Sequence, residues 1–133
     1  MTPVEQKNHR SALREETAVE KELREQISNG HYVIASKKPT IVSALAAIPK
    51  DGKDLRLIHD GSRPSGQAMN DYSVPDSVKF QTLADACKLA KTGYWCAKID
   101  LKAEYQSVCI HPDNYCVTGL KCTFGEDRHP IHV

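Results

Sequence analysis

The sequence predicts an α+β fold, and three patterns support this prediction. An amphipathic helix pattern spans residues 11–28, a β-hairpin pattern spans 41–60, and further strand patterns follow from residue 94 onward. The 133 residues match a single domain in length, and 40% of them are hydrophobic. We therefore expect a folded chain with a core rather than a disordered one.

The helix predicted over residues 11–28 has recognisable ends and one apolar stripe. Ser11 is a candidate N-cap, and Asn29-Gly30 is a typical helix stop. The other faces of the helix are charged, so we expect the stripe to pack on the segments that follow. The stripe consists of Ala12, Val19, Leu23 and Ile27.

Residues 31–40 are predicted to be irregular, and a hairpin follows them. A strand over 41–48 leads into a turn around Asp51-Gly52, which is a strong hairpin signal. The return strand spans 55–60. Its alternation predicts one face with Arg56, Ile58 and Asp60 and the other with Leu55, Leu57 and His59.

The middle of the chain is predicted to be a long loop, a short helix and a buried strand. Residues 61–80 are rich in loop-forming residues, and 82–92 form a helix in which Cys87 is a small core residue. The strand over 94–101 ends near the carboxylate of Asp100. A carboxylate at the end of a buried strand is costly unless something pairs with it, and a metal ion is one such partner.

The last part of the chain continues the strand pattern. We expect strands over 106–110 and 116–124, with a turn at 111–114 between them. The tail, residues 125–133, shows no apolar period.

The positive charge is concentrated in one segment. The net charge is +1, but residues 31–66 contain six basic and three acidic side chains. This distribution suits a local phosphate contact better than a nucleic-acid interface over the whole surface. A solvated surface segment of the same charge is the alternative.

Composition also indicates the compartment. No apolar run approaches the roughly 20 residues that span a bilayer, and the N-terminus lacks the apolar core of a signal peptide. The odd number of cysteines, five, is typical of free thiols in a reducing environment. We expect an intracellular protein, cytoplasmic or nuclear, that is neither secreted nor in the membrane.

Two chemistries based on cysteine find little support. No Cys-x2–4-Cys pair is present, so the pattern of structural zinc sites is missing. Cys109 and His111 would share one face of a strand, but no third group is evident to orient the histidine for thiol catalysis.

Several ordered motifs together resemble the reverse transcriptases. Ala97 to Tyr105 resembles motif A, and Ile-His-Pro-Asp and Thr-Gly-Leu-Lys-x-Thr-Phe follow it in family order. The resemblance covers roughly residues 10–124. It is best to the polymerases of retrotransposons, of the tyrosine-recombinase (DIRS-like) or gypsy-like kind.

The resemblance implies a fold and a domain order. It implies the fingers hairpin and a partial palm sheet of a right-hand polymerase, preceded by the amphipathic helix. The segments would be an N-terminal helical segment, a fingers-like hairpin and loop, a partial palm that contains motif A, and a divergent tail. Their ranges are 1–30, 31–80, 81–124 and 125–133.

The resemblance also implies a chemistry and its residues. The family transfers nucleotides from dNTP to a primer 3′ hydroxyl on an RNA or DNA template, with two Mg2+ ions. By resemblance, Asp100 is the catalytic metal ligand, together with the backbone carbonyl of Leu101. Tyr105 would stack under the sugar. The hairpin cations Lys50 and Arg56 would hold the triphosphate, and Arg63 and Asn70 would contact nucleic acid.

Two departures from the family affect the expected activity. The sequence contains no Tyr-x-Asp-Asp motif, which supplies the other metal-binding carboxylates in the family. Glu104 stands where the family usually has a small residue. We therefore expect this chain by itself, a fragment of the polymerase, to be inactive in polymerisation. The alternative is a non-catalytic remnant or co-opted module that binds nucleic acid weakly through Lys50, Arg56 and Arg63.

Overall fold

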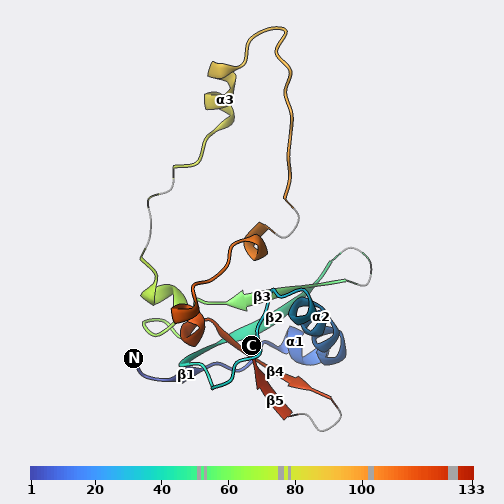
Figure 1. Ribbon diagram of the computed structural model, residues 1–133, viewed down its shortest axis with the longest axis vertical. Coiled ribbons are helices and arrows are strands. Elements are labelled where there is room, and N and C mark those ends of the chain that lie inside the picture. The colour runs from blue at the N-terminus through green and yellow to red at the C-terminus, as the bar shows by residue number, and fades with distance from the viewer. Residues whose placement is uncertain (51, 53, 75–76, 78, 102–103, 126–128) are drawn as a thin grey trace. The chain divides into compact units, whose positions relative to one another are not determined.

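The structure is a computed structural model that describes all residues except 51, 53, 75–76, 78, 102–103 and 126–128 (Figure 1). The chain forms two compact units. One comprises residues 1–73 and 109–133, and the other comprises residues 74–108. The first unit contains a mixed sheet with helices, so the α+β class is confirmed. Among the described residues, no helix has both the length and the apolar character needed to cross a bilayer.

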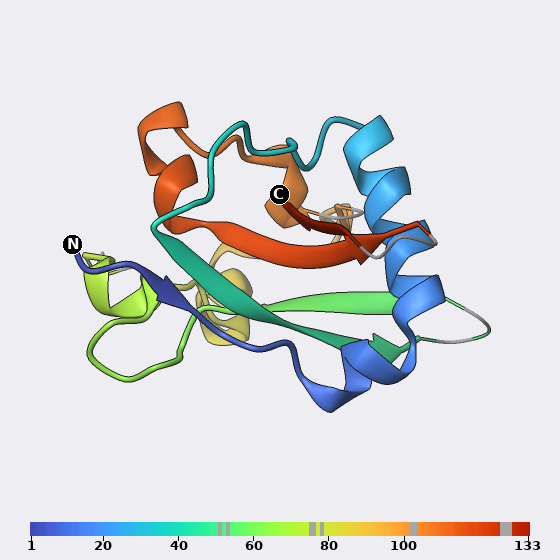
Figure 2. The same ribbon diagram turned by 90° about the horizontal axis from the view of Figure 1, so that it is seen from below.

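The sheet of the first unit is built around strand β2 (Ile41–Pro49). β2 pairs in parallel with β1 (Val4–Glu5) and β4 (Gly119–Phe124), and antiparallel with β3 (Leu55–Asp60). Figure 2 shows β2 crossing the unit with these strands beside it. Its first five residues, Ile41–Leu45, are all buried, including the polar Ser43, which fits a strand that is covered on both faces in this part.

The predicted hairpin is confirmed, and the predicted faces of its second strand are largely correct. Residues 44–49 of β2 pair with the whole of β3. Leu55 and Leu57 pack against the core, whereas Arg56 is exposed. At the turn, Gly52 has a φ of +87°, a conformation that glycine adopts without steric cost. Asp51, the other residue of the predicted turn signal, lies outside the described residues.

The helix predicted over residues 11–28 is observed as two helices, α1 (Arg10–Arg14) and α2 (Glu16–Ser28). The prediction that Ser11 is the N-cap is wrong, because Ser11 lies inside α1. Its hydroxyl instead accepts a hydrogen bond from the Ala47 N–H at 3.2 Å, which satisfies a backbone donor of β2.

The end of α2 agrees with the sequence. Asn29 is the C-cap, and its N–H donates to the carbonyl oxygens of Glu25 and Ile27. Gly30 follows with a φ of +76°, the left-handed conformation that often ends a helix.

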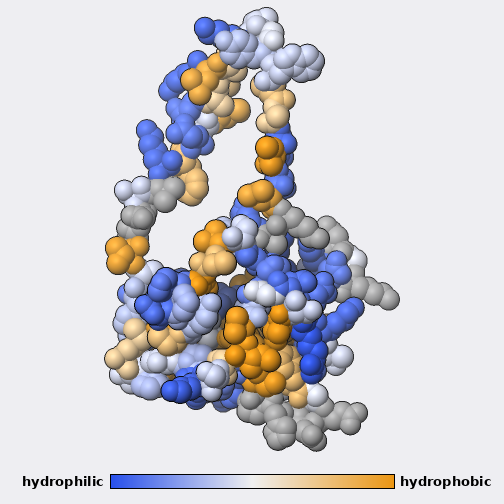
Figure 3. All heavy atoms as spheres, viewed as in Figure 1, coloured by the Kyte–Doolittle hydropathy of each residue, from blue (hydrophilic) through white to orange (hydrophobic). Residues whose placement is uncertain are grey.

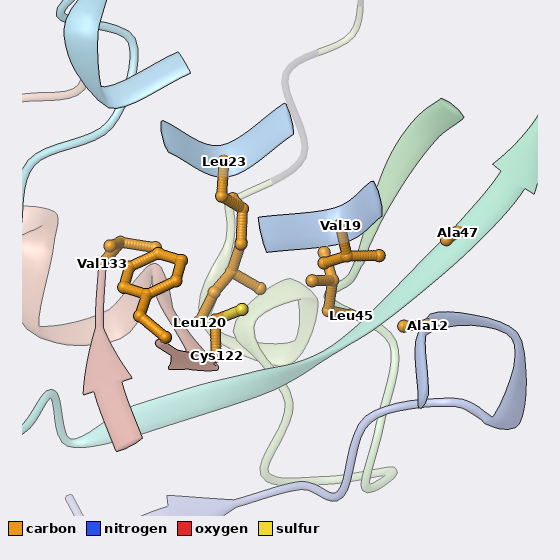
Figure 4. Packing of buried hydrophobic residues seen from close by; sticks show 9 residues of the cluster. Ala12, Val19, Leu23, Leu45, Ala47, Leu120, Cys122 and Val133 are labelled. Atoms are coloured by element: carbon orange, nitrogen blue, oxygen red, sulfur yellow. The ribbon is translucent and has the colours of Figure 1, made fainter. Parts of the chain in front are cut away.

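The core lies between the helices and one face of the sheet. Figure 4 shows Val19 and Leu23 pointing from α2 toward Leu45 of β2 and Leu120 of β4. The predicted stripe on the helix is therefore confirmed as the buried face. The buried cluster comprises Ala12, Val19, Leu23, Leu45, Ala47, Leu120, Cys122, Phe124 and Val133.

The C-terminal residues complete this core. Residues 129–132, where the sequence showed no apolar period, form β5 (His129–His132), which pairs antiparallel with β4. The backbone of Val133 exchanges two hydrogen bonds with Leu120, and its side chain is buried. The sheet therefore recruits this segment mainly through backbone bonds, which apolar periodicity does not reveal.

Two of the later predicted elements are shifted along the chain. The strand predicted over 116–124 is observed as β4 over 119–124, and the turn predicted at 111–114 belongs to a 3-10 helix, Pro112–Val117. Gly119 fits this position because a Cβ there would lie 3.0 Å from the Ile41 carbonyl oxygen and closer still to Pro39.

Other predictions for the middle of the chain are wrong. The helix predicted over 82–92 is shorter, α3 (Leu83–Leu89), and Cys87 is exposed rather than in a core. No strand is observed over 106–110, where a 3-10 helix at Glu104–Ser107 is followed by exposed coil. A helix of two turns buries little surface by itself, because burial requires other elements to pack on it. The local sequence pattern does not show whether such elements are present.

Large apolar side chains are exposed in the second unit. Trp95 is 100% exposed, and hydrophobic side chains occur along this part of the surface (Figure 3). The exposed set in this unit comprises Val74, Phe80, Leu83, Leu89, Tyr94, Trp95, Ile99, Leu101, Tyr105 and Val108.

One carboxylate connects three distant segments of the first unit. Glu5 of β1 accepts hydrogen bonds from Lys121 of β4, at 2.5 Å, and from Lys38. These bonds, led by the one from Lys121, lower the pKa of Glu5 to about 2. The charged form of Glu5 therefore favours the folded state.

We expect Leu23→Ala to lower the free energy of unfolding by about 2–5 kcal/mol, because Leu23 is fully buried and the change leaves a cavity. Urea denaturation followed by circular dichroism measures this loss. Leu13→Ala is the matched control, since Leu13 is 57% exposed on the neighbouring helix. Equal losses for the two variants would contradict the described core.

We expect Glu5→Gln to lower the free energy of unfolding by about 1 kcal/mol near neutral pH. Because the folded-state pKa of Glu5 lies below 4.5, its contribution is complete above pH 4.5 and is lost as the pH falls toward about 2. The difference between the variant and the original protein should shrink over that range in urea melts. Glu25→Gln, which removes an exposed carboxylate of α2, is the matched control, and the same pH profile for both variants would contradict the role of Glu5.

Candidate functional site

The two cations predicted to hold a triphosphate lie on one face of the β2–β3 hairpin. Arg56 is directly opposite Ile48 in the register, and the Lys50 N–H extends the ladder by a 2.8 Å bond to the Asp54 carbonyl. Side chains two residues apart share a face of a strand, so Lys50 joins Ile48 and Arg56 on that face. Lys50 and Arg56 are then diagonal neighbours, which in antiparallel pairs lie roughly 7–8 Å apart.

This face of the hairpin is open to solvent. Lys50 and Arg56 are exposed, and Ile48 between them is 51% exposed. Within the part of the chain that the structure describes, neither cation forms an ion pair. A mobile ammonium and a planar guanidinium on one face can both meet phosphate oxygens.

At the other end of β3, Asp60 organises the start of the following loop. Its Oδ1 accepts hydrogen bonds from the Ser62 hydroxyl at 2.5 Å and the Ser62 N–H at 3.1 Å. Its Oδ2 lies 3.0 Å from His9 Nε2. The hydroxyl bond, then the N–H bond and the His9 contact, lower the pKa of Asp60 to about 2. The carboxylate is therefore ionised at neutral pH.

Arg63 and Asn70, the predicted nucleic-acid contacts, lie in the loop organised by Asp60. Arg63 Nε is 3.8 Å from Asp60 Oδ2, and the Arg63 side chain is 69% exposed. The Asn70 N–H donates to the Gly61 carbonyl at 2.9 Å, which brings the two ends of the loop together. The structure thus places Arg63 in the loop after β3 and Asn70 in the 3-10 helix Met69–Tyr72 that ends it.

Sequence reasoning found part of this arrangement. The return strand was predicted to end at Asp60, but the contacts of its carboxylate were not predicted. Asp-Gly-Ser is a pattern in which an aspartate bonds to backbone two residues on, and this signal could have identified the Ser62 contact. His9 was missed because its contact spans 51 positions in the chain. No local signal identifies such a partner.

The predicted catalytic residues Asp100, Leu101 and Tyr105 belong to the second unit. All three are exposed, and Tyr105 lies in the 3-10 helix Glu104–Ser107. Lys50, Arg56, Arg63 and Asn70 belong to the first unit.

The prediction that residues 94–101 form a buried strand is wrong. These residues have no regular secondary structure, and each of them is exposed. A strand exists only where a neighbour supplies hydrogen bonds, and among the described residues no strand pairs with this segment. The Asp100 carboxylate is solvated, so it does not need the compensating partner that burial would require.

The described residues do not fit a two-metal site. None of their histidine, cysteine, aspartate and glutamate side chains gather in threes around a point where a metal ion could bind. A two-metal site needs several carboxylates held close together. Asp100 and the Leu101 carbonyl alone do not supply them.

A cavity of about 440 Å³ lies between the N-terminal segment, the helices and β4. Its apolar lining includes Ala12, Leu13, Val19 and Cys122. Several of its polar groups are already engaged within the protein. Glu5 pairs with Lys121, and the Asn8 amide bonds to the Leu45 N–H and the Lys121 carbonyl.

The buried thiol of this cavity is not activated. Burial raises the pKa of Cys122 to about 11, so the thiolate is scarce at neutral pH. The hairpin and its loop therefore remain the better candidate for a functional site.

Comparisons with protein-family models, with curated proteins and with solved structures found no match.

We expect the backbone amides of residues 94–101 to exchange hydrogen for deuterium rapidly, because the segment is exposed and unpaired. The amides of β2 should exchange slowly, since that strand pairs with three others. Hydrogen exchange read by mass spectrometry after proteolysis compares the two segments in one sample. Equal protection of both would restore the prediction of a buried strand.

Proposed function

We propose that this chain is the fingers and front palm of a retroelement reverse transcriptase, and that its own activity is to bind phosphates of nucleic acid and nucleotides. The observation that carries the proposal is the hairpin face with Lys50 and Arg56. Both cations are exposed, and both lack an ion pair among the described residues. An internal carboxylate partner would have reduced their attraction for phosphate.

The geometry of the hairpin favours a phosphate chain over a single phosphate. Two cations at diagonal positions can contact oxygens of neighbouring phosphates, as in a triphosphate or a nucleic-acid backbone. The guanidinium of Arg56 is suited to paired bonds with one phosphate, and the ammonium of Lys50 acts as a point charge on the next. Arg63, in the loop after β3, would add a further contact.

We propose nucleotide transfer for the intact polymerase and not for this chain by itself. By resemblance Asp100 would bind metal together with the Leu101 carbonyl, and Tyr105 would contact the sugar. The sequence has no Tyr-x-Asp-Asp motif, so the remaining carboxylates of a two-metal site are absent from this chain. A co-opted binding module is the second candidate. It is favoured by the exposed and unpaired state of residues 94–101.

The proposal predicts salt-dependent binding that depends on the hairpin. We expect Lys50→Gln/Arg56→Gln to weaken binding to a fluorescently labelled RNA–DNA template–primer, measured by anisotropy. The slope of log K against log salt should become shallower by roughly 1.4–1.8, since each phosphate contact contributes about 0.7–0.9. The same experiment with labelled dATP tests the triphosphate.

The matched control is Arg14→Gln/Lys21→Gln, which removes the same charge from exposed positions on α1 and α2. This variant should keep most of the original slope. If both double variants bind equally, the charge of the whole chain is responsible and the hairpin site is wrong.

A further inference from the structure

Residues 94–101 have the side-chain alternation of a β-strand, but among the described residues no strand pairs with them. Figure 1 shows the segment as extended chain. In extended chain successive side chains point to opposite faces, so the segment has two rows of side chains. One row is apolar and consists of Trp95, Ala97, Ile99 and Leu101.

The apolar row is exposed to solvent. Trp95 is 100% exposed, Ile99 is 85% exposed and Leu101 is 64% exposed. Removing such surface from water is favourable, and exposed apolar surface often marks an interaction site. The apolar row therefore favours a partner that covers it, and the opposite row indicates which partner fits.

The opposite row contains two charges of opposite sign, Lys98 and Asp100. Both are exposed, and within the described part of the chain neither forms an ion pair. Because the two charges flank Ile99, their order is self-complementary. When two copies of the segment run antiparallel with a two-fold axis at Ile99, Lys98 of each copy lies opposite Asp100 of the other.

Other arrangements of two such segments are less favourable. A parallel pair in register places Lys98 opposite Lys98 and Asp100 opposite Asp100, and like charges directly opposite each other are destabilising. An antiparallel pair with its axis at either charged residue places that residue opposite itself. A register shifted by one residue places the charged row of one copy on the apolar face of the other. The extended segment ends before Glu104, which begins a 3-10 helix.

The antiparallel pair about Ile99 also joins the apolar rows of the two copies. Ile99 faces its own counterpart across the axis, and Ala97 of each copy faces Leu101 of the other. The pair thus covers apolar side chains on one face and matches both charges on the other. Its backbone hydrogen bonds supply the pairing that no described strand of the same chain provides.

We propose that residues 94–101 are a self-association site, in which two copies of this chain pair these segments antiparallel about Ile99. A two-stranded ribbon is only marginally stable in water, so the association is weak, with a Kd of about 0.1 mM. The site lies outside the hairpin and does not rest on phosphate binding. It uses Asp100 in this chain by itself, whereas the metal role proposed for Asp100 belongs to the intact polymerase.

Sedimentation velocity over a concentration series of the full chain tests the association. We expect monomer at about 5 µM and mostly dimer at about 1 mM, in accordance with a Kd of about 0.1 mM. A chain that remains monomeric over the whole series would overturn the inference.

Charge reversal tests the register. Lys98→Asp gives each copy two negative charges in the row, and Asp100→Lys gives each copy two positive charges. We expect each variant alone to associate about tenfold more weakly, because both cross-strand pairs become repulsive. An equimolar mixture of the two variants should associate like the original protein, since every pair across the axis is again of opposite sign. If the mixture stays as weak as its components, the pairing about Ile99 is wrong.

The matched controls are Lys21→Asp and Glu25→Lys, which make the same changes of net charge at exposed positions of α2. These variants should keep the original Kd. If they weaken association as much as the changes at Lys98 and Asp100 do, the charge of the whole chain is responsible and the site is wrong. Thermal melts confirm that all variants are folded.

The fluorescence of Trp95 connects the association to this segment, because Trp95 is the only tryptophan of the chain. Its emission should shift to shorter wavelength as the concentration rises, since pairing moves the exposed indole out of water. The shift should follow the same concentration dependence as sedimentation and be reduced in Lys98→Asp. Dimer formation with unchanged Trp95 emission would assign the contact to another surface and overturn the inference.

Discussion

The first unit depends on the pairing of β2. This strand bonds to β1 and β4 near its start and to β3 along the rest of its length. After the short β1, side chains of the N-terminal segment accept hydrogen bonds from β2. The Asn8 amide oxygen accepts from the Leu45 N–H, and the Ser11 hydroxyl accepts from the Ala47 N–H. Because a buried backbone donor without a partner costs about 1–3 kcal/mol, these contacts fix the N-terminal segment against the strand.

Two carboxylates then hold together segments that are far apart in sequence. Glu5 joins β1 to Lys38 and to Lys121 of β4, and Asp60 joins the end of β3 to His9. In both cases the surrounding hydrogen-bond donors lower the carboxylate pKa to about 2. The charges in these clusters serve the fold, whereas Lys50 and Arg56 have no such partner among the described residues. That contrast distinguishes structural charges from those available to a ligand.

The two units differ in how far their apolar side chains are buried. In the first, apolar side chains from helices and strands share one buried cluster. In the second, the large apolar side chains of the described residues are exposed. Its helix α3 is capped locally, because the Thr82 hydroxyl accepts a bond from the Asp85 N–H. Local capping can form a short helix, but burial requires surfaces that only other elements provide.

Local chemistry determined the elements that are complete within a short stretch of sequence. The stripe from Ala12 to Ile27 indicated the buried helix face, and Asp51-Gly52 with the alternation after it indicated the hairpin and the position of Arg56. These features depend on periodicity and turn chemistry, which neighbouring residues set. The strand predicted over 94–101 had the same kind of local signal, but none of the described strands pairs with this segment.

Tertiary structure decided everything that depends on a distant partner. It assigned residues 129–133 to the sheet through backbone bonds with β4, and it brought His9 to Asp60 across 51 positions. It also left Asp100 in solvent, where the sequence alone indicated a buried carboxylate. The physical reason is common to all three. A hydrogen bond or a buried contact needs two partners, and the sequence near a residue describes only one of them.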